Sequence, residues 1–205
     1  MFATVSLGAI FVPLNFRLTG EELAFIIDDA GVHSLIVDPD LIPVVESVRK
    51  RLPCLRFYSV HGALDGFACL ESGLSVAAPV SEIASSSPHD TLLIMYTSGT
   101  TGLPKGAMLT HGNIVWNNVN ASLAFGANKS DVLLTAAPLF HIGGLNVMTI
   151  SAFQMGSPLV LLRHFDPEAV LDAIEEHSVT HMFGAPAMFL FMAQHPTFAA
   201  RDLSS

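Results

Sequence analysis

Short apolar runs alternate with amphipathic stretches along this chain. The runs in its second half are nearly continuous in apolar residues: "TLLIMYT" at 91–97, "DVLLTAAP" at 131–138, "SPLVLLR" at 157–163 and "VTHMFGA" at 179–185. Runs of this kind are expected of parallel strands that are covered on both faces, and their alternation with helices is typical of βαβ units. The sequence therefore predicts a doubly wound α/β fold with mostly parallel sheets and flanking helices.

The first half shows the same alternation together with clear signals for helix ends. Its predicted strands are "GAIFVPL" at 8–14, "SLIVD" at 34–38 and "LRFYSV" at 55–60. Thr19 and Glu22 form a T-x-x-E capping box, which predicts a helix that runs through Asp29. Asp38-Pro39 supplies an N-cap and a first-turn proline for the next helix, and the basic residues 49–51 suit its C-terminal end.

Further helices are predicted at 112–125, at about 144–155, and at 167–177 with Asp166 as N-cap. The segment 76–90, "VAAPVSEIASSSPHD", has the small, polar, proline-bearing composition of a connection. We therefore expect subregions 1–75 and 90–205, joined by that connection. A first helix is also expected to start almost at Met1, with no strand before it, so the chain is expected to begin inside a βα unit.

The composition is apolar enough to raise the question of a membrane span, with 51% hydrophobic and 13% charged residues. The charge-free stretch 132–162 is interrupted by prolines, glycines and polar residues, so no clean run of about 20 apolar residues remains. The N-terminus has neither a basic segment nor a small-residue cleavage site, so no signal peptide is predicted. We therefore expect no transmembrane segment.

The net charge and the number of cysteines bear on nucleic-acid binding and on the cellular compartment. The net charge is −9 and no basic stripe exists, so nucleic acid is not an expected partner. Cys54 and Cys69 are the two cysteines of the chain, and this number indicates buried thiols in a reducing compartment. The expected location is the cytoplasm.

The segment "MYTSGTTGLPKGAMLT" at 95–110 carries the strongest functional signal. From Thr97 to Gly106 it contains four hydroxyl residues, three glycines and one lysine. We expect a loop at the C-terminal end of the strand Leu92–Tyr96, where open α/β sheets bind ligands. Proteins bind polyphosphate with backbone amides, hydroxyl donors and a cation, and this segment supplies all three. The sequence therefore predicts a phosphate-binding site in this loop.

Other glycine-rich motifs do not match this segment. The P-loop of kinases and GTPases needs Gly-Lys-Ser/Thr, whereas Lys105 here follows a proline and precedes a glycine. No G-x-G-x-x-G occurs, so dinucleotide binding is not supported. Ser98 lacks the glycine two positions earlier that a nucleophile elbow requires.

The stretch "YTSGTTGLPKGAMLTHGN" at 96–113 resembles the phosphate-binding loop of the AMP-forming, adenylate-forming enzymes, which include acyl-CoA synthetases, peptide-synthetase adenylation domains and luciferases. "PLFHIGG" at 138–144 resembles the next family motif, whose histidine borders the acyl channel. "MFGAPAMF" at 182–189 resembles the strand and turn that line the acyl pocket. The similarity runs through the whole chain in family order, and is greatest to fatty-acid–CoA ligases.

The resemblance implies a reaction and a set of site residues. A carboxylic acid attacks the α-phosphorus of MgATP to give an acyl adenylate and pyrophosphate, and the thiol of CoA then takes the acyl group. The implied phosphate-binding residues are Thr97, Ser98, Gly99, Thr100, Thr101, Gly102 and Lys105, with Thr97 also a contact for Mg²⁺. The implied acyl-pocket residues are His141, Gly143, Gly144, Gly184, Ala185 and Pro186. ATP, Mg²⁺ and CoA are thus the expected cofactors and substrates.

The same motif bears on the class of acid. By the resemblance, relatives that activate amino acids carry Phe-Asp at the position of Phe140-His141. In those relatives the aspartate holds the ammonium group of the substrate. With histidine there an α-ammonium would lack a counter-charge, which favours a fatty or aryl acid. An acyl-AMP ligase that loads a carrier protein and a non-catalytic nucleotide- or acyl-binding module stay open as alternatives.

Several family motifs are not found within these 205 residues. They are the segment that stacks on adenine, the aspartate that holds the ribose, the hinge, and the C-terminal domain with its catalytic lysine. By the resemblance the chain is expected to be part of a large N-terminal AMP-binding domain. Expressed alone, it is expected to be inactive and to associate with itself through exposed apolar surface.

Overall fold

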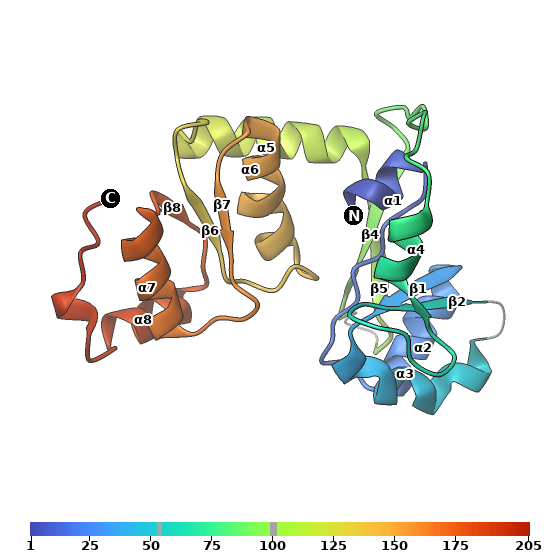
Figure 1. Cartoon of the computed structure of the whole chain (residues 1–205). Coiled ribbons are helices and arrows are strands. Elements are labelled where there is room, and N and C mark those ends of the chain that lie inside the picture. The colour runs from blue at the N-terminus through green and yellow to red at the C-terminus, as the bar shows by residue number, and fades with distance from the viewer. Residues whose placement is uncertain (53–54, 99–101) are drawn as a thin grey trace. The chain divides into compact units, whose positions relative to one another are not determined.

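The computed structural model describes residues 1–52, 55–98 and 102–205 (Figure 1). The chain divides into two compact units, Met1–Leu109 and Thr110–Ser205. Each unit contains a three-stranded parallel sheet with helices against it. The prediction of an α/β fold with mostly parallel sheets is confirmed.

The first unit contains two sheets. Its helices are α1 (Phe2–Ser6), α2 (Gly20–Asp29), α3 (Ile42–Val48) and α4 (Leu70–Val76), with 3₁₀ turns at Pro39–Leu41 and Arg49–Arg51. Its strands are β1 (Ser34–Val37), β2 (Arg56–Ser59), β3 (Ala68–Cys69), β4 (Thr91–Thr97) and β5 (Lys105–Thr110). The order β1-β2-β3 is parallel throughout, and β4 pairs with β5 in a separate sheet. Residues 77–90, all of which the structure describes, contain no helix or strand.

Helix α2 begins where its capping box predicts. The hydroxyl of Thr19 accepts from the N–H of Glu22, and the Glu22 carboxylate accepts from the N–H of Thr19. The buried face of α2 carries Leu23, Ala24, Ile26 and Ile27. Three of these, all but Ile26, join Val45 and Val48 of α3 and Leu35 and Val37 of β1 in one core cluster.

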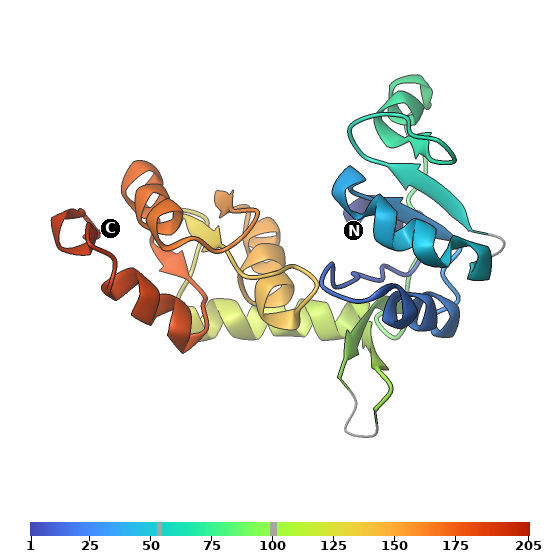
Figure 2. The same cartoon turned by 90° about the horizontal axis from the view of Figure 1, so that it is seen from below.

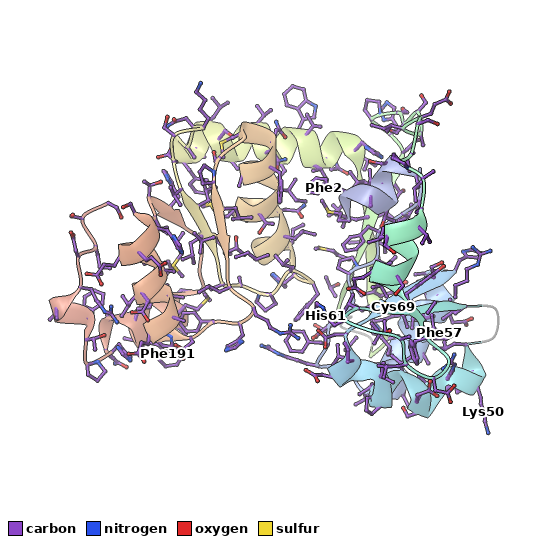
Figure 3. All side chains as sticks on the ribbon, viewed as in Figure 1. Phe2, Lys50, Phe57, His61, Cys69 and Phe191 are labelled. Carbon is purple, nitrogen blue, oxygen red and sulfur yellow. The ribbon has the colours of Figure 1, made fainter. Side chains whose placement is uncertain are left out.

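The guanidinium of Arg49 lies against the core of the first unit. It is 4.4 Å from the ring centroid of Phe57 and 4.8 Å from that of Phe67, and Nη2 donates to the carbonyl of Gly66 at 2.5 Å. Figure 3 shows Phe57 within the unit and the neighbouring Lys50 pointing away from the ribbon. Of the basic residues that follow α3, Arg49 therefore packs against the core and Lys50 is exposed to solvent.

The predicted strand at 8–14 is wrong, because only Phe11 pairs there. The N–H of Phe11 donates to the carbonyl of Leu92 and its carbonyl accepts from the N–H of Ile94, both at 3.0 Å. Pro13, two residues on, has no N–H to donate, so the ladder cannot continue. The segment therefore forms an isolated parallel bridge to β4.

The second unit is a parallel sheet with helices on both faces. Its helices are α5 (His111–Phe125), η3 (Gly143–Thr149), α6 (Ile150–Met155), α7 (Pro167–His177) and α8 (Pro186–Ala193), with a 3₁₀ turn at Phe198–Ala200. Its strands β6 (Leu133–Thr135), β7 (Leu159–Leu161) and β8 (His181–Met182) have the order β7-β6-β8. All three are shorter than the apolar runs that predict them.

The middle strand β6 connects the two cores of this unit. Leu133 lies in a cluster with Met148 of η3 and Ala152 of α6. Its neighbour Leu134 points to the other face and lies in a cluster with Val170 and Leu171 of α7. Because successive strand residues face opposite sides, the two leucines show that the sheet is covered on both faces. The doubly wound prediction is confirmed for this unit.

The helix predicted at about 144–155 is divided into two kinds of helix. Residues Gly143–Thr149 form a π-helix, and α-helical geometry begins at Ile150. Side chains compete for carbonyls in the π segment: the Thr149 hydroxyl donates to the Gly144 carbonyl at 2.8 Å, and Asn117 Nδ2 donates to the Asn146 carbonyl at 3.0 Å. Such single π turns are frequent at functional sites.

Two expectations about exposure can be compared with the structure. Within the described ranges no helix has the length and apolarity needed to cross a membrane. The expectation of a buried thiol is wrong for Cys69, which is half-buried and is the N-cap of α4, where Sγ accepts from the N–H of Ser72. Cys54 lies outside the described residues.

Candidate functional site

The predicted phosphate loop joins two adjacent strands. The strand expected at 92–96 is present as β4, and β5 follows after residues 98–104. Parallel neighbours need a crossover of about a dozen residues or more, so β4 and β5 form a hairpin (Figure 2). Thr97, Lys105 and Gly106 therefore belong to the strands, whereas the sequence places them in the loop. The loop also does not open a helix directly, because β5 lies between it and α5.

The described part of the loop presents its polar groups to solvent. Thr97, Ser98, Gly102 and Lys105 are all exposed. Lys105 has no ion pair with any residue in the described ranges, so no protein carboxylate there neutralises its charge. Gly102 has φ +98°, a conformation that favours glycine. The candidates Gly99, Thr100 and Thr101 lie outside the described residues.

His141 is held in a tight turn before the π-helix. The N–H of Gly143 donates to Nδ1 of His141 at 3.1 Å, so the neutral imidazole carries its proton on Nε2. The turn is closed by the N–H of His141, which donates to the Pro138 carbonyl at 3.2 Å. The exposed ring therefore presents an N–H donor on its free side.

The two glycines after His141 are required by close neighbours. A Cβ on Gly144 would lie 2.3 Å from the carbonyl oxygen of Pro138, and a Cβ on Gly143 would lie 2.7 Å from the ring of Phe183. Phe183 thus brings the segment of Gly184 against the turn of His141. The candidates Ala185 and Pro186 are the N-cap and first residue of α8. The structure therefore brings His141, Gly143 and Gly184 together.

Sequence reasoning missed a buried polar network beside this turn. Nδ2 of Asn118 on α5 donates to Gln154 at 2.8 Å, and the hydroxyl of Ser151 donates to Asn118 Oδ1 at 3.2 Å. Asn118 is 2% exposed although helices usually present such residues to solvent. These bonds hold α5 against α6. An asparagine amid the apolar face of α5 was the signal that could have revealed it.

A cavity of about 630 Å³ lies in the first unit, away from every described candidate residue. It is lined mainly by 9–16 and by the residues of β1. None of the described candidates of the phosphate loop or the acyl pocket borders it. The cavity is therefore not the acyl pocket that the sequence predicts. The described residues also include no group of three His, Cys, Asp or Glu that could hold a metal ion.

Several CoA ligases resemble this chain along its whole length. Feruloyl-CoA synthase of Amycolatopsis sp. is 39% identical over 100% of this chain, and indoleacetate–CoA ligase of Aromatoleum aromaticum is 37% identical over the same extent. The crystal structure of the anthranilate CoA ligase AuaEII in complex with anthranoyl-AMP superposes with a TM-score of 0.88 and 28% identity, over 99% of this chain and 40% of the ligase.

The chain spans 39% and 40% of the length of the two sequence relatives. The family model described as "AMP-binding enzyme" matches residues 1–205, the whole chain. Together with the hairpin loop and the turn of His141, this match establishes the family, and the chain belongs to the AMP-binding enzymes.

Proposed function

We propose that the complete protein is an ATP-dependent acid–CoA ligase that works through an acyl adenylate. The observation that carries this proposal is the hairpin loop with its exposed Lys105, in a chain whose relatives are named CoA ligases. AuaEII, a structural relative, was crystallised in complex with anthranoyl-AMP, an acyl adenylate, which supports the adenylate step. We assign residues 1–205 to the N-terminal AMP-binding domain of that enzyme.

In the first step a carboxylate oxygen attacks the α-phosphorus of ATP. The bond from that phosphorus to the bridging oxygen breaks, and pyrophosphate leaves with both electrons of the bond. Ser98, Thr100 and Thr101 would donate to the β- and γ-phosphates, and Lys105 would offset the charge that develops on the leaving group. Catalysis of this kind depends on positioning and on charge stabilisation.

Mg²⁺ would supply further positive charge to the polyphosphate. It prefers oxygen ligands and usually keeps several waters. Thr97 offers one hydroxyl oxygen, and no acidic cluster lies among the described residues to add more. Among the residues of this chain, Thr97 is therefore the candidate contact for the ion, whose other ligands would include phosphate oxygens and water.

In the second step the thiolate sulfur of CoA attacks the acyl carbonyl carbon, and AMP leaves. We assign His141, Gly143, Gly144, Gly184, Ala185 and Pro186 to the acyl pocket. The acid is an aryl acid in the first instance, because feruloyl, indoleacetate and anthranoyl in the names of the relatives are all aromatic. A fatty acid is the second candidate, since glycine and phenylalanine leave the pocket without a counter-charge for an ammonium group.

ATP–pyrophosphate exchange by the complete gene product tests this proposal. The panel should contain hydroxycinnamic, indoleacetic, aminobenzoic and medium- to long-chain fatty acids, followed by a thioester assay with CoA and with acyl carrier protein. Exchange and CoA thioester formation with one class of acid are expected. Exchange with transfer only to carrier protein would identify an acyl-AMP ligase. ATP binding without exchange would identify a non-catalytic module.

A further inference from the structure

Tyr96 is the next-to-last residue of β4, which ends at Thr97, and its side chain forms a hydrogen bond to Asp29 of α2. Leu93 and Met95 of the same strand are buried in the core, so Tyr96 leaves β4 on the other face. Its hydroxyl donates to Asp29 Oδ2 at 2.5 Å. Burial, followed by the hydrogen bond and the charge of Asp29, raises the pKa of Tyr96. The hydroxyl therefore remains a donor at neutral pH.

The ring of Tyr96 also touches the strand that leaves the loop. A Cβ on Gly106 would lie 2.8 Å from Cγ2 of Ile94 and 3.0 Å from Cζ of Tyr96. The backbone of β5 therefore lies directly against this ring, with room for hydrogen alone at position 106. Tyr96 thus lies one residue before Thr97 at one end of the hairpin loop, and its ring contacts Gly106, the residue that follows Lys105, at the other end.

Asp29 is well placed to hold that ring still. It is the last residue of α2, and although Asp29 itself is exposed, the buried side chains of the helix hold α2 against the core of the first unit. A carboxylate at a helix C-terminus is unfavourable because the negative end of the helix dipole lies there. The hydrogen bond from Tyr96 offsets part of this cost. Asp28 is acidic at the same helix end, so Asp29 is distinguished by its hydrogen bond from Tyr96 and not by its position in the helix.

We propose that Asp29 and Tyr96 are positioning residues for the phosphate loop. The hydrogen bond fixes the ring, the ring fixes where β4 ends and β5 begins, and these ends set where Ser98 and Lys105 meet the polyphosphate. A displacement of about 1 Å in a positioning group is enough to cost a large factor in rate. The proposal rests on the proposed function, because the loop must bind ATP for its position to affect a rate.

The test uses the complete gene product and four variants. Asp29→Ala and Tyr96→Phe remove the bond, Asp29→Asn keeps an oxygen that accepts from the phenol, and Asp28→Ala removes an exposed neighbouring charge at the same helix end. We expect Asp29→Ala and Tyr96→Phe each to lower kcat/KM for ATP about 3- to 10-fold. KM for the acid should not change. Asp29→Asn and Asp28→Ala should remain close to wild type.

The double variant Asp29→Ala/Tyr96→Phe decides whether the two residues act together. If they do, it should be no worse than either single variant. The inference is overturned if the losses multiply, if Asp28→Ala loses as much as Asp29→Ala, or if KM for the acid rises in parallel. A wild type without exchange would instead refute the proposed function. An active wild type with unchanged Asp29→Ala and Tyr96→Phe would refute this inference alone.

Discussion

Gly144→Ala is expected to destabilise the second unit by steric conflict with the backbone. The added Cβ would lie 2.3 Å from the Pro138 carbonyl oxygen and 2.7 Å from that of Ala137. Cβ atoms essentially never come within 3.0 Å of such atoms, so the turn must open by ~0.7 Å, the difference between 3.0 and 2.3 Å. Forcing extra atoms into a packed site costs about 1–3 kcal/mol, and backbone neighbours place this site at the upper end.

The net loss of stability is smaller, because alanine is more favourable than glycine in a helix by about 0.5–1 kcal/mol. We therefore expect a loss of about 2 kcal/mol, which for a chain of this size is a fall in Tm of about 4–8 °C. Circular dichroism during heating and in urea measures it. Gly73→Ala in α4 is the matched control, because nothing lies within 4 Å of its Cβ, and its Tm should stay level or rise. Equal Tm values for Gly144→Ala and wild type would refute the steric argument.

Three further predictions concern the loop, a helix cap and the exposed surface. Lys105→Ala should lower kcat/KM in ATP–pyrophosphate exchange about 10- to 100-fold, because a charged contact to phosphate is lost. The control Lys50→Ala, at another exposed lysine, should leave kcat/KM unchanged. Equal rates for Lys105→Ala and wild type would mean that the loop is misassigned. The backbone N–H and then the hydroxyl of Thr19 lower the pKa of Glu22 from its usual 4.5, so its contribution to stability is present above that value and is lost as the pH falls through the lower folded-state pKa. Urea titrations should therefore show that wild type has a larger free energy of unfolding than Glu22→Gln above about pH 4.5, and that this difference shrinks in acid. A difference that does not depend on pH would contradict this. The 205-residue chain alone should bind a dye for apolar surface and associate with rising concentration in sedimentation experiments. Phe191→Ser in the apolar helix α8 (Figure 3) should reduce both, and unchanged dye binding and association would contradict this.

Local signals in the sequence predicted helix ends well. The capping box of Thr19 and the N-cap Asp166, whose Oδ1 accepts from the N–H of Ala169 at 2.9 Å, depend on residues three positions apart. Their partners are therefore visible in a short window. The apolar runs at 131–138, 157–163 and 179–185 likewise predicted three parallel strands, whereas the run at 91–97 became β4 and pairs with β5 in a hairpin.

Features that depend on distant partners could not be predicted. The strand β5 has four exposed residues at its start and no apolar alternation, so its pairing with β4 left little trace in the sequence. Phe183 reaches Gly143 across forty positions, and Tyr96 reaches Asp29 across 67. Such contacts are set by how the elements assemble, and neither member of the pair carries a local pattern that names the other.

The strand order β7-β6-β8 has a consequence for synthesis on the ribosome. Leu133 in the middle strand pairs with Leu159 on one side and with His181 on the other. The central strand β6 is therefore translated before both of its neighbours. At a translation rate of about 5–20 residues per second, β8 follows β6 only about 2–10 s later. Throughout that interval β6 has an unpaired edge and two leucines that end up buried. A pause in translation before Met182 would prolong the exposure of this edge, and nascent β6 is the segment of the second unit that a chaperone would be expected to bind first.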